Sequence, residues 1–228
     1  MTEDVKPRRH YNAARRQAQA AQTRQDILDA AHQLFLDRGY AGTTLAAIAQ
    51  AAGVVVETIY RAYGSKAELF KAVIRVAVAG SANRAQVPAE QRPAIAAVIA
   101  ETDPHRQLGL YAATQPGIHA RAGPLQRVLI GAAATDPDLT QLWTQIEDER
   151  RNGLARFAGL LADRGVLRPD LSVEEARDLL WTLNSLAVHD LLVLQCGWSP
   201  ERYRDWLAGA LARELLPDRR SHPGRPPL

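Results

Sequence analysis

Apolar residues recur every three to four positions along most of this 228-residue chain, and period-two alternation is almost absent. This spacing is typical of amphipathic α-helices. The stretch from Thr23 to Phe70 divides into four predicted helices. The breaks between them fall at three glycines, Gly39, Gly53 and Gly64, because glycine readily ends a helix in a left-handed conformation.

Capping signals indicate where the outer two of these helices begin. Thr23 followed by Asp26 predicts the start of the first helix, and Ser65 followed by Glu68 predicts the start of the fourth. The two middle helices are short and are joined by a turn that contains Gly53. Two short helices joined in this way form the helix–turn–helix pattern, whose second helix enters the major groove of DNA.

Several residues of this stretch occur at characteristic spacings: Thr44, Ile48, Ala49, Ala52, Gly53, Val54, Thr58, Ile59, Tyr60, Lys66, Glu68 and Leu69. Together they resemble the N-terminal signature of TetR-family transcriptional regulators. The resemblance implies an all-α fold, with a three-helix helix–turn–helix DNA-binding head and a larger C-terminal helical domain for ligand binding and dimerisation. The chain departs from the family pattern at Val55, where a capping Ser or Thr is usual, and at Ala62, where a phosphate-contacting His is common.

Phosphate contacts are predicted for four residues of the head. Thr43 and Thr44 lie at a predicted helix N-terminus, where hydroxyls, amides and the helix dipole favour an anion. Tyr60 and Lys66 match positions that hold phosphates in the family that the sequence resembles. Such contacts set the register of a protein on DNA and carry no sequence information.

Base contacts are predicted for the second helix of the motif. Val56 could pack on a thymine methyl group, Glu57 could accept a hydrogen bond from cytosine, and Arg61 could donate two to guanine. Val55 and Thr58 complete the predicted DNA-binding set. The alternative is that Glu57 and Arg61, four residues apart, only pair with each other on a solvated face.

The resemblance and the composition divide the chain into four predicted parts: a flexible basic N-terminal arm over 1–22, the head over 23–66, a helical regulatory and dimerisation domain over 67–216, and a disordered tail over 217–228. The arm carries Arg8, Arg9, Arg15 and Arg16. Two interpretations of it stay open. It is a disordered tail, or it contacts DNA phosphates or a minor groove.

The sequence of the regulatory domain predicts further helices. The segment from His105 to Thr135 predicts two helices with a bend, because Pro and Gly interrupt it. Asp136 and Pro137 open a long helix that ends near Gly165. The run from Glu147 to Arg151 alternates in charge and predicts a solvated face of that helix.

Two C-terminal helices are the predicted dimer contact. Ser172 and Glu175 cap a helix that reaches Cys196 and is apolar on nearly all sides, so a partner subunit is expected to cover part of it. Ser199 and Pro200 open the last helix. The resemblance implies a homodimer through helices around 172–196 and 199–216, hence a palindromic operator. The alternative is that both helices form the core of a monomer.

The resemblance also implies a small-molecule effector site. Polar or aromatic residues on otherwise apolar helices are its candidate lining: Tyr111, His119, Trp143, Trp181, Asn184 and His189. The alternative is that each is a core residue whose polar atoms find internal partners.

Composition narrows the functional class. Hydrophobic residues make up 46% and charged residues 23% of the chain, as in soluble globular proteins, and the net charge of +3 permits binding to nucleic acid. Cys196 is the single cysteine, which excludes a disulfide within the chain. No secretory leader or membrane span is predicted, so we expect a cytoplasmic protein.

No catalytic motif, cofactor site or metal-ligand spacing occurs in the sequence, and an enzyme is therefore the disfavoured class. We expect a sequence-specific transcriptional regulator, with repression by operator occupancy as the default mode and release by a ligand. The alternative is a helical interaction protein whose DNA-binding head has degenerated, as the departures at Val55 and Ala62 would allow.

Overall fold

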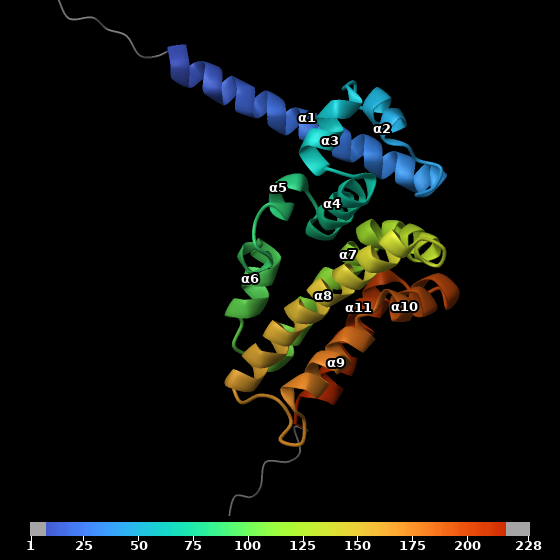
Figure 1. Ribbon diagram of the computed structural model, residues 1–228. Coiled ribbons are helices and arrows are strands. Elements are labelled where there is room, and N and C mark those ends of the chain that lie inside the picture. The colour runs from blue at the N-terminus through green and yellow to red at the C-terminus, as the bar shows by residue number, and fades with distance from the viewer. Residues whose placement is uncertain (1–7, 218–228) are drawn as a thin grey trace, which may run out of the picture. The chain divides into compact units, whose positions relative to one another are not determined.

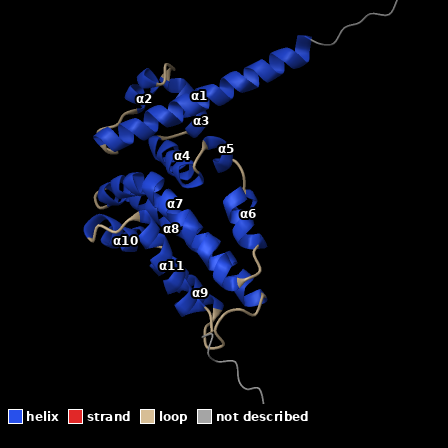
Figure 2. Cartoon of the chain, turned by 180° about the vertical axis from the view of Figure 1, so that it is seen from behind, coloured by secondary structure: helices blue, strands red, loops and turns tan. Residues whose placement is uncertain are grey.

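The computed structural model describes residues 8–217, and every regular element in this range is a helix, which confirms the predicted all-α fold (Figures 1 and 2). The α-helices are α1 (Arg8–Arg38), α2 (Leu45–Ala51), α3 (Val56–Tyr63), α4 (Lys66–Ala79), α5 (Ala82–Ala85), α6 (Pro93–Ala100), α7 (Pro104–Ala133), α8 (Pro137–Asp163), α9 (Val173–Leu183), α10 (Leu186–His189) and α11 (Pro200–Leu215). A 3₁₀ turn, η1 (Ala89–Gln91), precedes α6, and a π-helical segment, η2 (Asp190–Gln195), follows α10.

The contacts between residues divide the chain into two compact units. The first comprises the residues up to Ala77 together with Pro124–Leu142, and the second comprises Val78–Gly123 together with the residues from Trp143 onward. The predicted boundaries at 23–66 and 67–216 stay a prediction. The first unit differs from the predicted head because it includes most of α4 and the α7–α8 corner.

Aromatic and aliphatic side chains form the core of the first unit. Ile27, Ala31 and Phe35 are fully buried along α1, as their spacing predicts. The Phe35 and Phe70 rings lie 4.4 Å apart between centroids, and the Tyr40 ring lies 5.4 Å from Phe70. These contacts join α1 and the loop that follows it to α4.

The first helix begins earlier than predicted. It starts at Arg8, so the predicted start at Thr23 is wrong. No proline or glycine interrupts residues 8–22, which include several strong helix formers. Asp26 accepts a hydrogen bond from Gln22 Nε2 at 2.8 Å, one turn earlier in the same helix. The part of the predicted arm that the structure describes is therefore helical, whereas residues 1–7 lie outside the described range.

Two further predictions about helices are corrected. The segment around Pro116 and Pro124 forms one continuous helix, α7, because a proline removes only one hydrogen bond and buried neighbours such as Ala112 and Leu125 favour its continuation. The helix predicted to reach Cys196 is instead broken after α9. Ser185 caps a new start there, since its Oγ accepts from Val188 N at 3.2 Å.

The predicted starts of α8, α9 and α11 are confirmed. Ser172 and Glu175 form a reciprocal capping box, in which Glu175 N donates to Ser172 Oγ at 3.2 Å and Ser172 N donates to Glu175 Oε2 at 2.9 Å. Asp136 accepts from Asp138 N, and Ser199 accepts from Arg202 N. Apart from Pro217, the predicted tail lies outside the described residues.

Within residues 8–217, no individual helix has both the length and the apolar composition needed to cross a bilayer. Within the same residues, α2 and α3 meet the length and composition criteria when they are taken together as a pair. The two helices are bent by 110° at the turn between them.

Candidate nucleic-acid interface and a buried polar network

The turn between α2 and α3 has the geometry that the sequence predicts. Thr44 is the N-cap of α2, and its Oγ1 accepts a hydrogen bond from Ala47 N at 3.1 Å. Gly53 then adopts a φ of 65°, a conformation that glycine enters without strain. The chain reverses at this point and α3 begins at Val56.

Thr43 is a supporting residue. Its side chain is fully buried, and its Oγ1 lies 2.9 Å from the Leu34 carbonyl oxygen and 2.8 Å from that of Gly39. A hydroxyl in this position satisfies carbonyl groups at the C-terminus of α1. The phosphate contact of Thr43 stays a prediction that its buried hydroxyl does not support, whereas the neighbouring Thr44 is exposed.

Lys66 connects the end of the head to the α1–α2 loop. Its ammonium group donates to the carbonyl oxygens of Tyr40 and Thr43, both at 2.9 Å, and lies 4.0 Å from the centre of the Tyr40 ring. Desolvation lowers the pKa of Lys66, and the charge of Asp136 opposes this shift. Its phosphate contact stays a prediction and would use the third N–H bond of the ammonium group.

One face of α3 is open to solvent. Val55 and Tyr60 are 64% and 54% exposed, and Glu57 and Arg61 are exposed beside them. Ile59 is fully buried and fixes the opposite face, while Val56 and Thr58 are half-buried. Val55 is the N-cap and makes no side-chain capping bond, as its residue type predicts. The exposed face is thus made largely of residues predicted to contact DNA.

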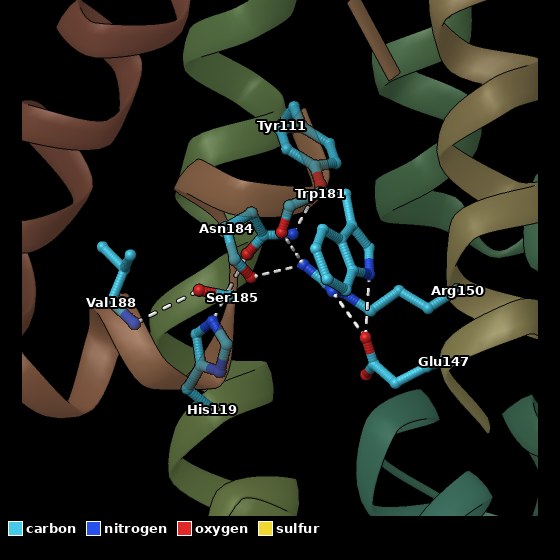
Figure 3. Close-up of polar contacts among 8 residues, drawn as sticks. All are labelled: Tyr111, His119, Glu147, Arg150, Trp181, Asn184, Ser185 and Val188. Atoms are coloured by element: carbon cyan, nitrogen blue, oxygen red, sulfur yellow. Dashed lines mark hydrogen bonds and ion pairs between the residues drawn. The ribbon is translucent and has the colours of Figure 1, made fainter. Parts of the chain in front are cut away.

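A separate polar network lies in the second unit (Figure 3). Asn184, at the break after α9, donates from Nδ2 to the Tyr111 hydroxyl at 2.6 Å. Its Oδ1 lies 3.3 Å from His119 Nε2. All three side chains are buried, and they connect α7 to the end of α9.

Aromatic rings continue this network. The His119 and His189 rings stack with centroids 4.5 Å apart, and the Tyr203 ring meets His189 edge-on at 5.1 Å. Burial, followed by the neighbouring His189, lowers the pKa of His119 to about 4, so this imidazole is neutral at pH 7. Burial raises the pKa of Tyr111 to about 12 and also raises that of Tyr203. The buried Tyr203 hydroxyl has no hydrogen-bond partner among residues 8–217.

Arg150 holds the C-terminal end of α9. Its Nη2 donates to the carbonyl oxygens of Trp181 at 2.6 Å and Asn184 at 2.9 Å, and its Nη1 donates to Glu147 Oε2 at 3.1 Å. Trp181 Nε1 donates to the same Glu147 oxygen at 2.8 Å. The side chains of Arg150 and Glu147 are only 22% and 18% exposed, so the prediction of a solvated face is wrong for these two residues.

The sequence contained a signal for these two residues. Partly or fully buried residues of α8 recur at alternating intervals of four and three: Trp143, Glu147, Arg150, Leu154, Phe157 and Leu161. Glu147 and Arg150 therefore fall on the inward stripe of the helix, although their charge indicates solvent. Tyr203 is buried on α11 together with Leu207 and Leu211, a spacing that indicates a core residue and gives no signal of a polar role.

Five of the six residues predicted to line an effector site meet in this network: Tyr111, His119, Trp181, Asn184 and His189. Trp143, half-buried on α8, takes no part in the contacts given above. Within the described range, no group of three or more His, Cys, Asp or Glu side chains could hold a metal ion.

A helix–turn–helix with an exposed second helix, joined to a helical body, defines the class of DNA-binding regulators. Residues 27–73 match the family model described as "Bacterial regulatory proteins, tetR family". The HTH-type transcriptional repressor BepR of Brucella suis is 30% identical over 172 residues, which cover 73% of this chain and 78% of BepR. The chain belongs to the TetR family of transcriptional regulators.

Other relatives and solved structures agree with this assignment. The regulator TtgR of Pseudomonas putida is 45% identical over 60 residues, which cover 26% of this chain and 29% of TtgR. NalD of Pseudomonas aeruginosa, a repressor of the MexAB-OprM multidrug efflux pump, has a crystal structure with a TM-score of 0.67. It is 24% identical, and the match covers 87% of this chain and 99% of NalD, which shows a shared fold. The family and these relatives are regulators, so the chain is a DNA-binding transcriptional regulator and not an enzyme.

Proposed function

We propose that this regulator is a homodimeric repressor that binds a palindromic operator through α2 and α3 and is released by a small-molecule ligand. The exposed face of α3 is the observation that carries this proposal, because Val55 and Tyr60 remain uncovered beside the charged Glu57 and Arg61. Apolar and charged groups side by side suit the mixed chemistry of base edges in the major groove. Repression is the proposed mode because BepR is named a repressor. Since its target is DNA, we place the protein in the cytoplasm.

The proposed division of labour follows the exposure of each side chain. Thr44, Tyr60 and the remaining donor of Lys66 contact phosphates and set the register. Val56, Glu57 and Arg61 contact bases, and Val55 and Thr58 lie at the edge of this surface. Thr43 is omitted, because its side chain is buried.

Selection of a randomised duplex pool by the purified protein, followed by sequencing, tests this proposal. We expect enrichment of two inverted half-sites. Glu57→Ala and Arg61→Ala should change which bases are enriched, at about 1–3 kcal/mol of discrimination for each lost base contact. Arg75→Ala, an exposed residue of α4 outside the proposed surface, should leave the enriched sequence unchanged.

A folded wild-type protein that enriches no sequence, with and without candidate effectors, would reject operator reading. If it also lacked salt-dependent affinity for duplex DNA, the interaction protein with a degenerate head would be favoured. If both variants reduced the affinity for all duplexes equally, Glu57 and Arg61 would be a solvated pair and would not contact bases.

Two leucines support the proposed dimer contact. Leu191 and Leu194 of η2 are 51% and 57% exposed, and both lie in the segment 172–196. Exposed apolar groups of this size are typical of an interface with a partner. Leu191→Lys with Leu194→Lys should shift the protein to monomers in sedimentation and abolish binding to the palindrome. Leu110→Lys, 40% exposed on α7, is the matched control, and a wild-type monomer at micromolar concentration would reject the dimer.

The buried polar network supports the proposed effector site. Tyr111, His119, Trp181, Asn184 and His189 converge there, and the Tyr203 hydroxyl is a buried polar atom for which a ligand could supply the missing partner. Trp143 stays a candidate contact. The test is a screen of apolar compounds with polar substituents for release of a labelled operator. A Tyr203→Phe variant that responded to an active compound as wild type does would remove this hydroxyl from the site.

A further inference from the structure

We propose that the N-terminal extension of α1, residues 8–24, is a second DNA-contacting element that binds the phosphate backbone beside the operator half-site. The inference rests on the proposed DNA-binding function and adds an interaction surface to it. Its basis is the juxtaposition of a helix rich in arginine with a head that carries no net charge.

The positive charge of the chain is concentrated in this extension. Between Arg8 and Gln25 the sequence contains five arginines and no Asp or Glu. The rest of the head, residues 26–77, contains five Lys or Arg and five Asp or Glu and is therefore neutral. Removing the five arginines from the 28 basic residues leaves 23 against 25 acidic ones, a net charge of −2.

A neutral head is a weak ligand for duplex DNA. Affinity for the backbone comes mainly from Lys and Arg side chains that neutralise phosphates and release counterions. Of the five cations in residues 26–77, Lys66 already donates to two carbonyl oxygens, and Asp136 lies near enough to act on its pKa. The extension is consequently the main source of net positive charge in the first unit.

Residues 15–22 of the extension form no apolar face that could pack against protein. All residues from Arg15 to Gln22 are exposed, and alanine is the only apolar residue type among them. A helix with these properties is marginal in water, because most helical stability comes from packing. A polyanion alongside it would stabilise both the arginines and the helix.

The extension leaves the head beside α3, the second helix of the helix–turn–helix. The charge of Arg24 acts on the hydroxyl of Tyr63, the last residue of α3, and lowers its pKa against the larger effect of burial. Both ribbon views place α1 next to α3, with its N-terminal part projecting beyond the head (Figures 1 and 2). At 1.5 Å per residue, residues 8–22 add about 22 Å of helix to the surface of the head.

The test is the salt dependence of binding by full-length Arg15→Gln/Arg16→Gln, measured on the selected operator and on a random duplex of equal length. Each lost phosphate contact reduces the slope of log K against log salt by about 0.9 on duplex DNA, so we expect a reduction of about 1.8. The affinity lost between 50 and 200 mM salt should then be about tenfold smaller than for wild type. The change should be equal on both duplexes, because phosphate contacts are independent of sequence.

The matched control is Arg106→Gln/Arg156→Gln, which removes two charges from exposed arginines of the second unit. We expect its slope to equal that of wild type. A slope that is unchanged for Arg15→Gln/Arg16→Gln, or reduced equally in the control, would overturn the proposal. If wild type enriches an operator but Arg15→Gln/Arg16→Gln has an unchanged salt slope, only the DNA contact of the extension is refuted and the proposed function stands. A reduced slope on random duplex without operator enrichment would support the extension and refute operator reading.

Discussion

The missing cap of α3 gives a direct test of how this head is stabilised. Val55 occupies the N-cap position with φ −85° and ψ 151°, and Ser199 occupies the same position of α11 with φ −68° and ψ 155°. Ser199 Oγ accepts a hydrogen bond from Arg202 N at 3.2 Å. The dihedral angles of Val55 therefore suit a capping side chain, although Thr58 N already donates to the Val55 carbonyl oxygen at 3.0 Å.

Replacing Val55 with serine should supply this acceptor. The new hydroxyl would accept from Thr58 N, three residues later, as Thr44 Oγ1 accepts from Ala47 N at 3.1 Å in α2. This bond would share or replace the one that Thr58 N now donates to the Val55 carbonyl oxygen. A side-chain cap stabilises a helix by about 1 kcal/mol relative to alanine. Since Val55 is 64% exposed, its removal sacrifices little buried area, and Val55→Ala measures that loss separately. We expect Val55→Ser to be more stable than Val55→Ala by up to about 1 kcal/mol, because the new bond competes with the one to the Val55 carbonyl oxygen.

Urea unfolding without DNA measures this difference. Circular dichroism at 222 nm follows all helices, whereas fluorescence follows the four tryptophans, Trp143, Trp181, Trp198 and Trp206, which all belong to the second unit. If the circular dichroism and fluorescence transitions occur at different urea concentrations, the added stability of Val55→Ser must appear in the circular dichroism transition of the head. Thr44→Ala is the reverse control and should lose about 1 kcal/mol. Equal stability of Val55→Ser and Val55→Ala, together with the expected loss in Thr44→Ala, would refute the capping argument.

Three further predictions concern buried polar groups. Arg150→Met should lower the free energy of unfolding by about 2 kcal/mol in urea titrations, because it leaves Glu147 and two carbonyl groups without their donor. Thr43→Val should cost about 1 kcal/mol in the same assay and leave the enriched operator unchanged, since the lost hydroxyl only supports α1. His119 has a pKa of about 4 in the folded protein against 6.5 in the reference state, so the unfolded chain binds the proton first. The free energy of unfolding should therefore fall by up to about 3 kcal/mol as the pH drops from about 6.5 to 4, and His119→Phe should lack this component.

The sequence predicts the head well because short-range rules determine it. Glycines at Gly39, Gly53 and Gly64 all adopt positive φ and separate the first four helices as expected. Capping residues such as Ser65 bond to the amide of the third helical residue, here Glu68 N at 3.1 Å. Each of these features depends on only a few neighbouring residues, so no knowledge of distant contacts is needed.

Errors arise where distant contacts override local preference. Pro116 and Pro124 each cost α7 one hydrogen bond, yet the helix continues because its buried residues favour a single element. The charges of Glu147 and Arg150 predict that both side chains are exposed to solvent. Instead, Glu147 accepts a hydrogen bond from Trp181, and Arg150 donates to carbonyl groups at the end of α9. Those partners are more than 30 residues away, and no local pattern identifies them.

The arginine-rich extension has one feature that the sequence predicts and one that it does not. Its charge was visible in the sequence, and its helical state was not, because a helix without an apolar stripe gives no periodic signal. Helical order nevertheless changes what the arginines can do, since a flexible arm must be ordered on binding whereas a helix presents Arg15 and Arg16 at fixed spacing. Under the proposed function, this arrangement together with a neutral head would separate two tasks: α3 would discriminate between base sequences, and α1 would supply most of the attraction to the backbone. Changes in α1 should then alter affinity for every duplex, whereas changes in α3 alter the choice among them.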